Sequence, residues 1–155
     1  MRRRMKFIII LMIFISFYCL SGCNNNPMSN SDWRGTTLFQ KPGLIDSLIG
    51  TCSTYLIHTI PLDSLDFRNY GNISFNLDAM TDGDLSGLSI YYVRADTSVY
   101  LVNLNGQTEI SNTKFISIPS PKIKDKLFMR LKLFASVCTG ENYHLTVRDL
   151  RISGN

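Results

Sequence analysis

The sequence is poor in the residues that most enzymes use for acid–base and metal chemistry. Its 155 residues include two histidines, His58 and His144, and two glutamates, Glu109 and Glu141. Each histidine stands among apolar residues of a strand-like segment, which is typical of a packed or surface position. There is no Gly-x-Ser-x-Gly motif and no Cys-x-x-Cys motif, so the signatures of a serine hydrolase, a zinc site and a thioredoxin-like centre are missing. The composition therefore disfavours an enzyme.

The sequence also lacks a hydrophobic run that is long enough to cross a membrane comfortably. The longest run, residues 7–20, contains one serine and no charged residue. As a helix it would measure about 21 Å, whereas the hydrocarbon core of a bilayer is about 30 Å thick. A cluster of cations precedes it, and no charged cluster follows it directly. This layout is typical of a cleaved secretory signal peptide and not of a membrane anchor.

The hydrophobic run ends in the tetrapeptide Leu-Ser-Gly-Cys, residues 20–23, which resembles the lipobox of bacterial lipoproteins. The resemblance implies that residues 1–22 are removed, that the Cys23 thiol carries a diacylglycerol and that the new amino group is acylated. Two or more acyl chains hold a protein firmly at a membrane. Asn24 follows the cysteine, and the absence of Asp there favours the outer membrane over the inner one. The first expected partner is therefore the membrane of a bacterial envelope, bound through lipid on Cys23.

Removal of the leader also removes the apparent basic character of the chain. The full sequence has sixteen Lys and Arg against twelve Asp and Glu. Arg2, Arg3, Arg4 and Lys6 belong to the leader, so the mature chain has twelve residues of each sign. A balanced chain gives no electrostatic argument for a nucleic acid partner.

Removal of the leader and lipidation would also account for two of the four cysteines. Cys19 lies in the leader and Cys23 is the lipid site, which leaves Cys52 and Cys138. An even pair in an exported, oxidising compartment predicts a disulfide, and two free buried thiols are the alternative.

The mature chain divides into a tether and one domain. Residues 23–45 are rich in Asn and Ser, with Pro and Gly interspersed, and we predict that they form a flexible tether. Residues 46–155 are long enough for one hydrophobic core and too short for two. The only candidate for a helix in the mature chain covers residues 44–49.

The pattern of the domain has a period of two, which is typical of half-buried strands. Residues 72–80 alternate between apolar and polar positions, and residues 126–138 place Leu, Met, Ala and Val on one face. The opposite face of the second segment carries Phe128, Arg130, Lys132 and Phe134.

Further strands, turns and a bulge follow from the same pattern. The other predicted strands are residues 51–60, 88–95, 98–104, 107–110, 114–118 and 143–153. Asn105-Gly106 is the strongest hairpin signal, and a change of apolar phase predicts a bulge near Arg148-Asp149. Seven or eight short strands indicate an all-β fold, an antiparallel β-sandwich. The layout of residues 50–154 resembles the jelly-roll domains of the galactose-binding and carbohydrate-binding-module type, a resemblance that bears on fold more than on function.

Tyrosines supply the candidate ligand-binding residues. Tyr91, Tyr92 and Tyr100 stand on adjacent predicted strands, so one member of the Tyr91-Tyr92 pair must point outward if the strand is regular. Outward aromatic rings can stack on sugars or fill a protein interface. Tyrosine is also a favoured strand residue that stabilises cross-strand pairs, and this reading stays open.

One acidic stretch is a candidate for a metal site. Asp78, Asp82 and Asp84 could offer hard oxygen ligands to Ca²⁺, although Asp and Gly are equally the residues of an ordinary turn. No other cofactor is expected.

The function predicted from these observations is that of a membrane-anchored lipoprotein. Its non-catalytic β-sandwich domain would dock to an envelope protein or a glycan. A periplasmic enzyme inhibitor or immunity-type protein is the alternative, with an envelope hydrolase as a further one.

Overall fold

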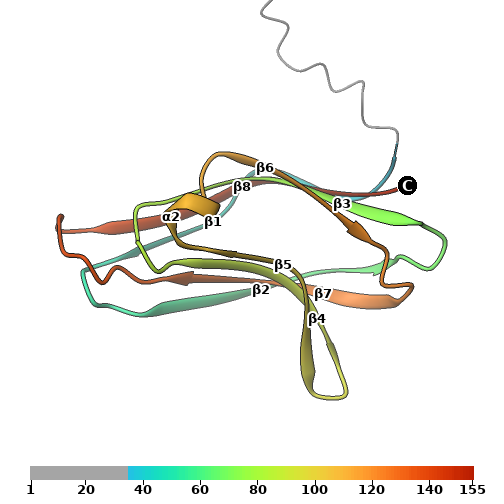
Figure 1. Ribbon diagram of the computed structural model, residues 1–155, viewed down its shortest axis with the longest axis horizontal. Helices are drawn as coiled ribbons and strands as arrows, with labels where there is room; N and C mark the ends of the chain where they lie inside the picture. The colour runs from blue at the N-terminus through green and yellow to red at the C-terminus, as the bar shows by residue number, and fades with distance from the viewer. Residues whose placement is uncertain (1–34) are drawn as a thin grey trace, which may run out of the picture. The chain divides into compact units, whose positions relative to one another are not determined.

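Eight strands of the chain build two antiparallel sheets, which pack face to face (Figure 1). The structure is a computed structural model and describes residues 35–155. The elements are β1 (Thr36–Gly50), β2 (Leu56–Asp66), β3 (Asn72–Thr81), β4 (Gly87–Arg94), β5 (Thr97–Asn105), α2 (Gly106–Glu109), β6 (Thr113–Pro119), β7 (Lys124–Leu133) and β8 (Tyr143–Gly154). Sheet A has the order β1-β8-β3-β6 and sheet B the order β2-β7-β4-β5. The prediction of an antiparallel, jelly-roll-like sandwich of seven or eight strands is confirmed, with eight strands in residues 35–155.

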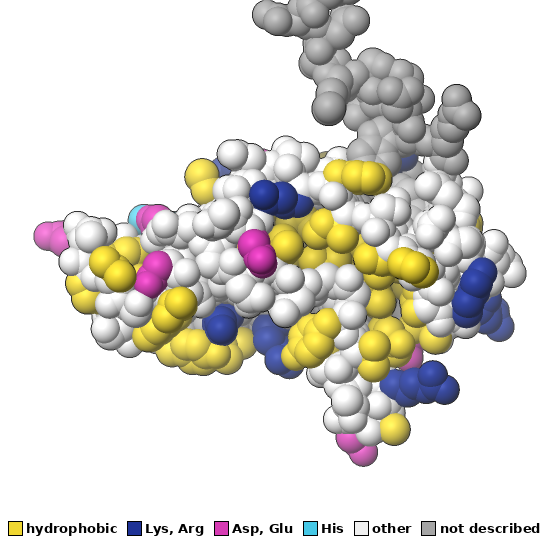
Figure 2. All heavy atoms as spheres, viewed as in Figure 1, with side chains coloured by type: hydrophobic (Ala, Val, Ile, Leu, Met, Phe, Trp, Pro, Cys, Tyr) yellow, Lys and Arg dark blue, Asp and Glu magenta, His cyan; other side chains and the backbone are white. Residues whose placement is uncertain are grey.

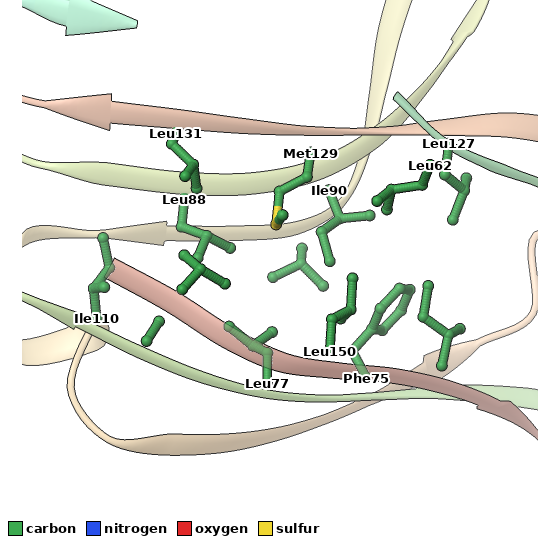
Figure 3. Packing of buried hydrophobic residues seen from close by; sticks show 14 of the residues in the cluster. Leu62, Phe75, Leu77, Leu88, Ile90, Ile110, Leu127, Met129, Leu131 and Leu150 are labelled. Atoms are coloured by element: carbon green, nitrogen blue, oxygen red, sulfur yellow. The ribbon is translucent and has the colours of Figure 1, made fainter. Parts of the chain in front are cut away.

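The core between the sheets follows from the period-two pattern. Successive side chains of a strand point to opposite faces, so one half of each central strand is buried. The side chains that meet in Figure 3 include Leu88, Ile90, Leu127, Met129 and Leu131 from sheet B and Phe75, Leu77 and Leu150 from sheet A. Each of these side chains is almost completely buried. Burial of such a side chain contributes about 1.5–3 kcal/mol, so this layer is the main source of stability.

The sandwich begins earlier than the sequence predicts. β1 starts at Thr36 and pairs with β8 along its length, so the prediction of a tether as far as residue 45 is wrong, and so is that of a helix over residues 44–49. β1 is an edge strand whose side chains are mostly exposed, and its register shifts twice between Lys41 and Asp46. Both features remove the regular alternation by which a strand is recognised.

The leader and the lipobox belong to the part of the chain that the structure leaves undescribed. The predicted signal peptide (residues 1–22), Cys23 and residues 24–34 all lie outside the described residues. Among residues 35–155, no helix has the length and apolar character needed to span a membrane.

The predicted bulge near Arg148-Asp149 is present. Asp149 has a φ of 52°, and its carboxylate accepts a hydrogen bond of 2.7 Å from the backbone N–H of Gly43 on β1. The pairing of β3 with β8 is interrupted at the same place. The extra residue allows Val147 and Leu150 both to face the core, where both are fully buried.

One turn between predicted strands is a hairpin as expected, but the strongest hairpin signal, Asn105-Gly106, is not. β4 and β5 are joined by Ala95 and Asp96, whose φ values of 47° and 60° are those of a type I′ turn. Asn105-Gly106 makes no hairpin, because Gly106 begins α2, which occupies most of the predicted strand 107–110. The chain passes here from β5 in sheet B to β6 in sheet A, so it must cross between the layers and cannot fold straight back.

The predicted disulfide is present and ties two turns together. Cys52 and Cys138 are bonded, with their Cα atoms 5.5 Å apart. Both cysteines lie outside the strands in which they were predicted, because β2 begins at Leu56 and β7 ends at Leu133. Leu56 and Leu133 are paired, so the bridge closes the sandwich just beyond the last rung of the β2–β7 ladder.

Candidate binding groove on the outer face of sheet B

The outer face of sheet B carries aromatic and basic side chains that the strand alternation selects. β7 lies in the middle of this sheet between β2 and β4. Its inward residues supply the core, so its other residues face outward together with their cross-strand partners. The outward residues of β7 and β4 are Lys126, Phe128, Arg130 and Lys132 from β7 and Gly87, Ser89 and Tyr91 from β4.

A group of aromatic rings forms one end of this face. The Tyr91 ring stacks on Phe128 with centroids 5.6 Å apart, and it lies 5.6 Å from the Tyr100 ring. Tyr91 is only 4% exposed because its neighbours cover it, whereas Tyr100 is 49% exposed. Tyr92 points the other way and joins the core. Of the three candidate tyrosines, Tyr100 therefore offers the accessible ring, Tyr91 supports it and Tyr92 is structural.

Arg130 is held in place by the two outward tyrosines. Its Cζ lies 4.8 Å above the centre of the Tyr91 ring, close enough for a cation–π contact. Nη2 donates to the Tyr91 hydroxyl at 3.1 Å, and Nη1 lies 3.5 Å from the Tyr100 hydroxyl. The guanidinium has five N–H donors in a fixed plane, so these contacts orient the fork and leave donors for a ligand.

A shallow groove of about 320 Å³ runs across the sheet beside Arg130. Tyr55, which directly precedes β2, and Tyr100, on β5, line it from the two edges of the sheet. Between them lie polar side chains and Gly87. The full lining is Tyr55, Ile57, Gly87, Leu88, Ser89, Tyr100, Asn103, Asn105, Arg130 and Lys132.

The space-filling view shows the same mixture at the rim of the sheet. In Figure 2 the lower edge of the molecule, formed by the layer β2-β7-β4-β5, carries Lys and Arg side chains beside hydrophobic ones. The Lys132 ammonium lies 5.9 Å from the Tyr55 ring, and the Lys126 ammonium lies 5.8 Å from the Phe128 ring. Each of these lysines therefore lies near an aromatic ring, as Arg130 does.

The aspartates predicted as calcium ligands are placed apart. Asp82 accepts hydrogen bonds from the backbone N–H of His144 and lies 3.1 Å from its ring nitrogen Nδ1. Asp84 accepts from the hydroxyl and the backbone N–H of Ser136, and these bonds lower the pKa of its carboxyl. Asp78 lines a different depression on sheet A. Among residues 35–155, no three His, Cys, Asp or Glu side chains form a group that could hold a metal ion.

Both histidines contact aspartates through their ring nitrogen Nδ1. His58 Nδ1 lies 2.6 Å from Asp46 Oδ2 and links an edge strand of sheet B to an edge strand of sheet A. His144 pairs with Asp82 and lines a shallow depression with Met80, Thr81 and Thr146. Neither histidine lines the groove of sheet B. The structure places both in strands, as predicted.

The sequence indicated part of this site and missed the rest. The sequence places Tyr91 and Tyr100 on adjacent strands, as the structure has them, and the outward row of β7 is visible in its alternation. Tyr55, Asn103 and Asn105 were missed because a groove across a sheet joins residues far apart in sequence. A strand-order prediction would have been needed to bring them together.

Comparisons with known proteins give similarities of fold and no family. No family model matches the chain, and no curated protein matches it. The CBM36-1 domain of a multidomain xylanase from the hindgut metagenome of Trinervitermes trinervoides is 14% identical, with 79% of this chain and 92% of that chain covered and a TM-score of 0.36. The structure titled Family 16 Carbohydrate Binding Module-2 is 10% identical, with 78% and 87% covered and a TM-score of 0.40.

An adhesin domain gives a similarity of the same size. The K1 cleaved adhesin domain of Lys-gingipain from Porphyromonas gingivalis W83 is 13% identical, with 82% of this chain and 88% of that chain covered and a TM-score of 0.39. Similarities of this size carry no information about the ligand of this chain.

Proposed function

We propose that this protein is a non-catalytic glycan-binding lipoprotein. The β-sandwich binds a saccharide chain in the groove on the outer face of sheet B, and lipid on Cys23 holds the domain at the surface of a bacterial envelope membrane. The groove itself is the observation that carries the proposal.

The composition of the groove suits sugars. Saccharides present apolar ring faces and a rim of hydroxyl groups, so their sites combine aromatic rings with amide and hydroxyl side chains. Tyr55 and Tyr100 are each about half exposed, and they lie on either side of Ser89, Asn103 and Asn105. The volume of about 320 Å³ lies within the range of small-ligand sites. An open groove also allows a longer chain to continue past both ends.

A glycan array probed with the detergent-solubilised full-length lipoprotein tests the binding proposal. We expect a defined set of glycans to bind, and Tyr100→Ala to reduce that binding strongly, since it removes the exposed ring. Lys41→Gln, on the exposed edge of sheet A, is the matched control and should bind as the unmodified protein does. A protein captured from the envelope without any glycan signal would overturn the proposal in favour of protein docking.

The lipid anchor needs a separate test. Cells that express the protein are grown with a palmitate analogue, and the label on the chain is compared with that on Cys23→Ser. We expect the label to disappear in the variant. Equal labelling of both chains would overturn the assignment of Cys23 as the lipid site.

A further inference from the structure

We infer that the groove of sheet B selects anionic saccharides, which carry uronate, sulfate or phosphate groups. This inference rests on the proposed glycan-binding function and adds the chemical class of the ligand. Two cations, Arg130 and Lys132, line the groove, and no carboxylate side chain lines it. Lys126 extends the same outward row of β7 beyond the groove.

No carboxylate within residues 35–155 forms an ion pair with these cations. The close contacts between basic and acidic side chains in this part of the chain join His58 to Asp46, Arg68 to Asp66 and His144 to Asp82. Arg130, Lys126 and Lys132 contact aromatic rings and hydroxyls instead. A chain whose mature form is balanced in charge thus gathers unpaired positive charge in the middle of one sheet. A ligand with negative charge would complete these contacts.

Arg130 has the geometry of a binding residue for a carboxylate or a sulfate. The guanidinium lies over the Tyr91 ring with its Cζ 4.8 Å from the centroid, and contacts with the hydroxyls of Tyr91 and Tyr100 restrict its rotation. A planar fork held in this way can donate two parallel hydrogen bonds to an oxyanion with little further loss of conformational freedom. Tyr100, which orients the fork, is also the exposed ring of the groove, so one sugar residue could stack there and present its acidic group to Arg130.

The surroundings favour a saccharide over an anionic membrane surface as the source of the negative charge. Asn103, Asn105 and Ser89 line the groove, where they can bind hydroxyl groups, and the two asparagines are exposed whereas Ser89 is recessed beyond the reach of a flat bilayer. Ser89 is only 7% exposed. The groove therefore fits a chain that enters it, with acidic groups spaced along neutral, hydroxyl-bearing rings.

Matched pairs of acidic and neutral polysaccharides test the inference. Affinity electrophoresis or calorimetry compares polygalacturonate with its methyl ester, and dextran sulfate with dextran, using the full-length lipoprotein in detergent. We expect an acidic member to bind at least about tenfold more tightly than its neutral partner, because a charge-assisted hydrogen bond to Arg130 has no neutral equivalent. This preference should weaken between low salt and 0.5 M NaCl, at roughly which concentration exposed charges are strongly screened.

Two variants assign the preference to the groove. Arg130→Gln should reduce acidic binding at least about tenfold and leave neutral binding nearly unchanged. Lys132→Gln, which loses only an exposed contact with Tyr55, should reduce it less and serves as a second variant in case the loss of Arg130 disturbs the Tyr91 packing. Lys41→Gln is the control for a change of one charge on the other sheet.

The possible outcomes distinguish a failure of the anionic preference from a failure of the proposed glycan-binding function. Equal or tighter binding of the neutral partners overturns the anionic preference and leaves glycan binding standing. Acidic binding that Arg130→Gln and Lys132→Gln leave unchanged also overturns it. Binding to phosphatidylglycerol micelles without binding to either acidic polysaccharide would assign the positive face to lipid and overturn the inference. No glycan bound on the array overturns the proposed function itself.

Discussion

Gly87 on β4 lies directly opposite Lys132 on β7, in the part of the sheet that forms the groove. A Cβ added at Gly87 would lie 3.3 Å from Lys132 Cε and 3.6 Å from Asn105 Oδ1. The nearest atom belongs to the far end of a flexible side chain, which can move aside. The absence of a side chain at this position therefore keeps the groove open without being needed for the fold.

Gly87→Ala should weaken glycan binding and leave the melting temperature nearly unchanged, because the added methyl group projects into the groove between Lys132 and Asn105. Gly71→Ala is a matched control, since its Cβ would meet only the Asn155 carbonyl at 3.6 Å. Binding is measured on the glycan that gives the strongest array signal, and unfolding by circular dichroism. Unchanged binding in a well-folded Gly87→Val variant would move the ligand site away from this groove.

Loss of the Cys52–Cys138 bridge should reduce stability and spare binding. The bridge closes a loop with a sequence separation of 86 residues, for which chain entropy gives a ceiling of about 4–5 kcal/mol. The double variant Cys52→Ala/Cys138→Ala should therefore unfold at lower denaturant while binding as before at low temperature. Denaturant unfolding of both forms under oxidising conditions measures the difference. Identical midpoints would show that the bridge contributes nothing to the folded state.

The Asp66–Arg68 pair should make the free energy of unfolding decrease at acidic pH. Hydrogen bonds from the Arg68 side chain and backbone lower the pKa of Asp66 from 3.8 to about 2. A carboxyl whose pKa is lower in the folded state stabilises the fold above its unfolded pKa, and that contribution is lost as the pH falls from about 4 to about 2. Carboxyl chemical shifts should show Asp66 titrating near pH 2 in the native protein and nearer its usual value in Arg68→Gln. Equal midpoints in the two proteins would contradict this account.

Tyr143 should be required for an ordered turn between β7 and β8. Its hydroxyl donates to the Val137 carbonyl at 2.8 Å and accepts from the backbone N–H groups of Thr139 and Gly140 at 2.6 and 3.1 Å. Tyr143→Phe removes all of these bonds while keeping the ring, so it should lower the melting temperature and increase amide exchange at Thr139 and Gly140. Tyr55→Phe, on an exposed ring, is the control. Unaltered exchange at both amides would show that the turn is held by other contacts.

The strands that the sequence predicted well are those with one buried, apolar face and one more exposed, polar face. β3 and β7 each bury one face completely, so alternation located them within a few residues. β1 was assigned to a tether and a helix because an exposed edge strand with register shifts has no such contrast. β7 was predicted to reach residue 138, but Ser136 binds Asp84 instead of continuing the ladder. A hydrogen bond between a side chain and a distant backbone amide does not change the apolar–polar periodicity of the sequence, so that periodicity cannot predict where such a bond ends a strand.

In the candidate site, too, local alternation predicted some features and missed those that depend on distant contacts. The outward position of Tyr91 or Tyr92 followed from alternation, but which of the two faced the core depended on the register with β7, where Tyr91 lies opposite Phe128. The aspartates of residues 78–84 looked like metal ligands because sequence spacing does not reveal partners such as Ser136 and His144. Contacts between distant segments decided these positions, and no local pattern encodes them.

The proposed anchor at Cys23 would give the position of the disulfide a mechanical consequence. A pull on a bound glycan would travel from Arg130 along β7 to Cys138, across the bridge to Cys52, and along β1 to Thr36. Residues 53–129 are bypassed on this covalent path, so tension along it does not stretch them. Under tension, β1 should therefore extend first. The groove on sheet B should keep its structure, and so its ability to bind, while this edge strand is pulled away from β8.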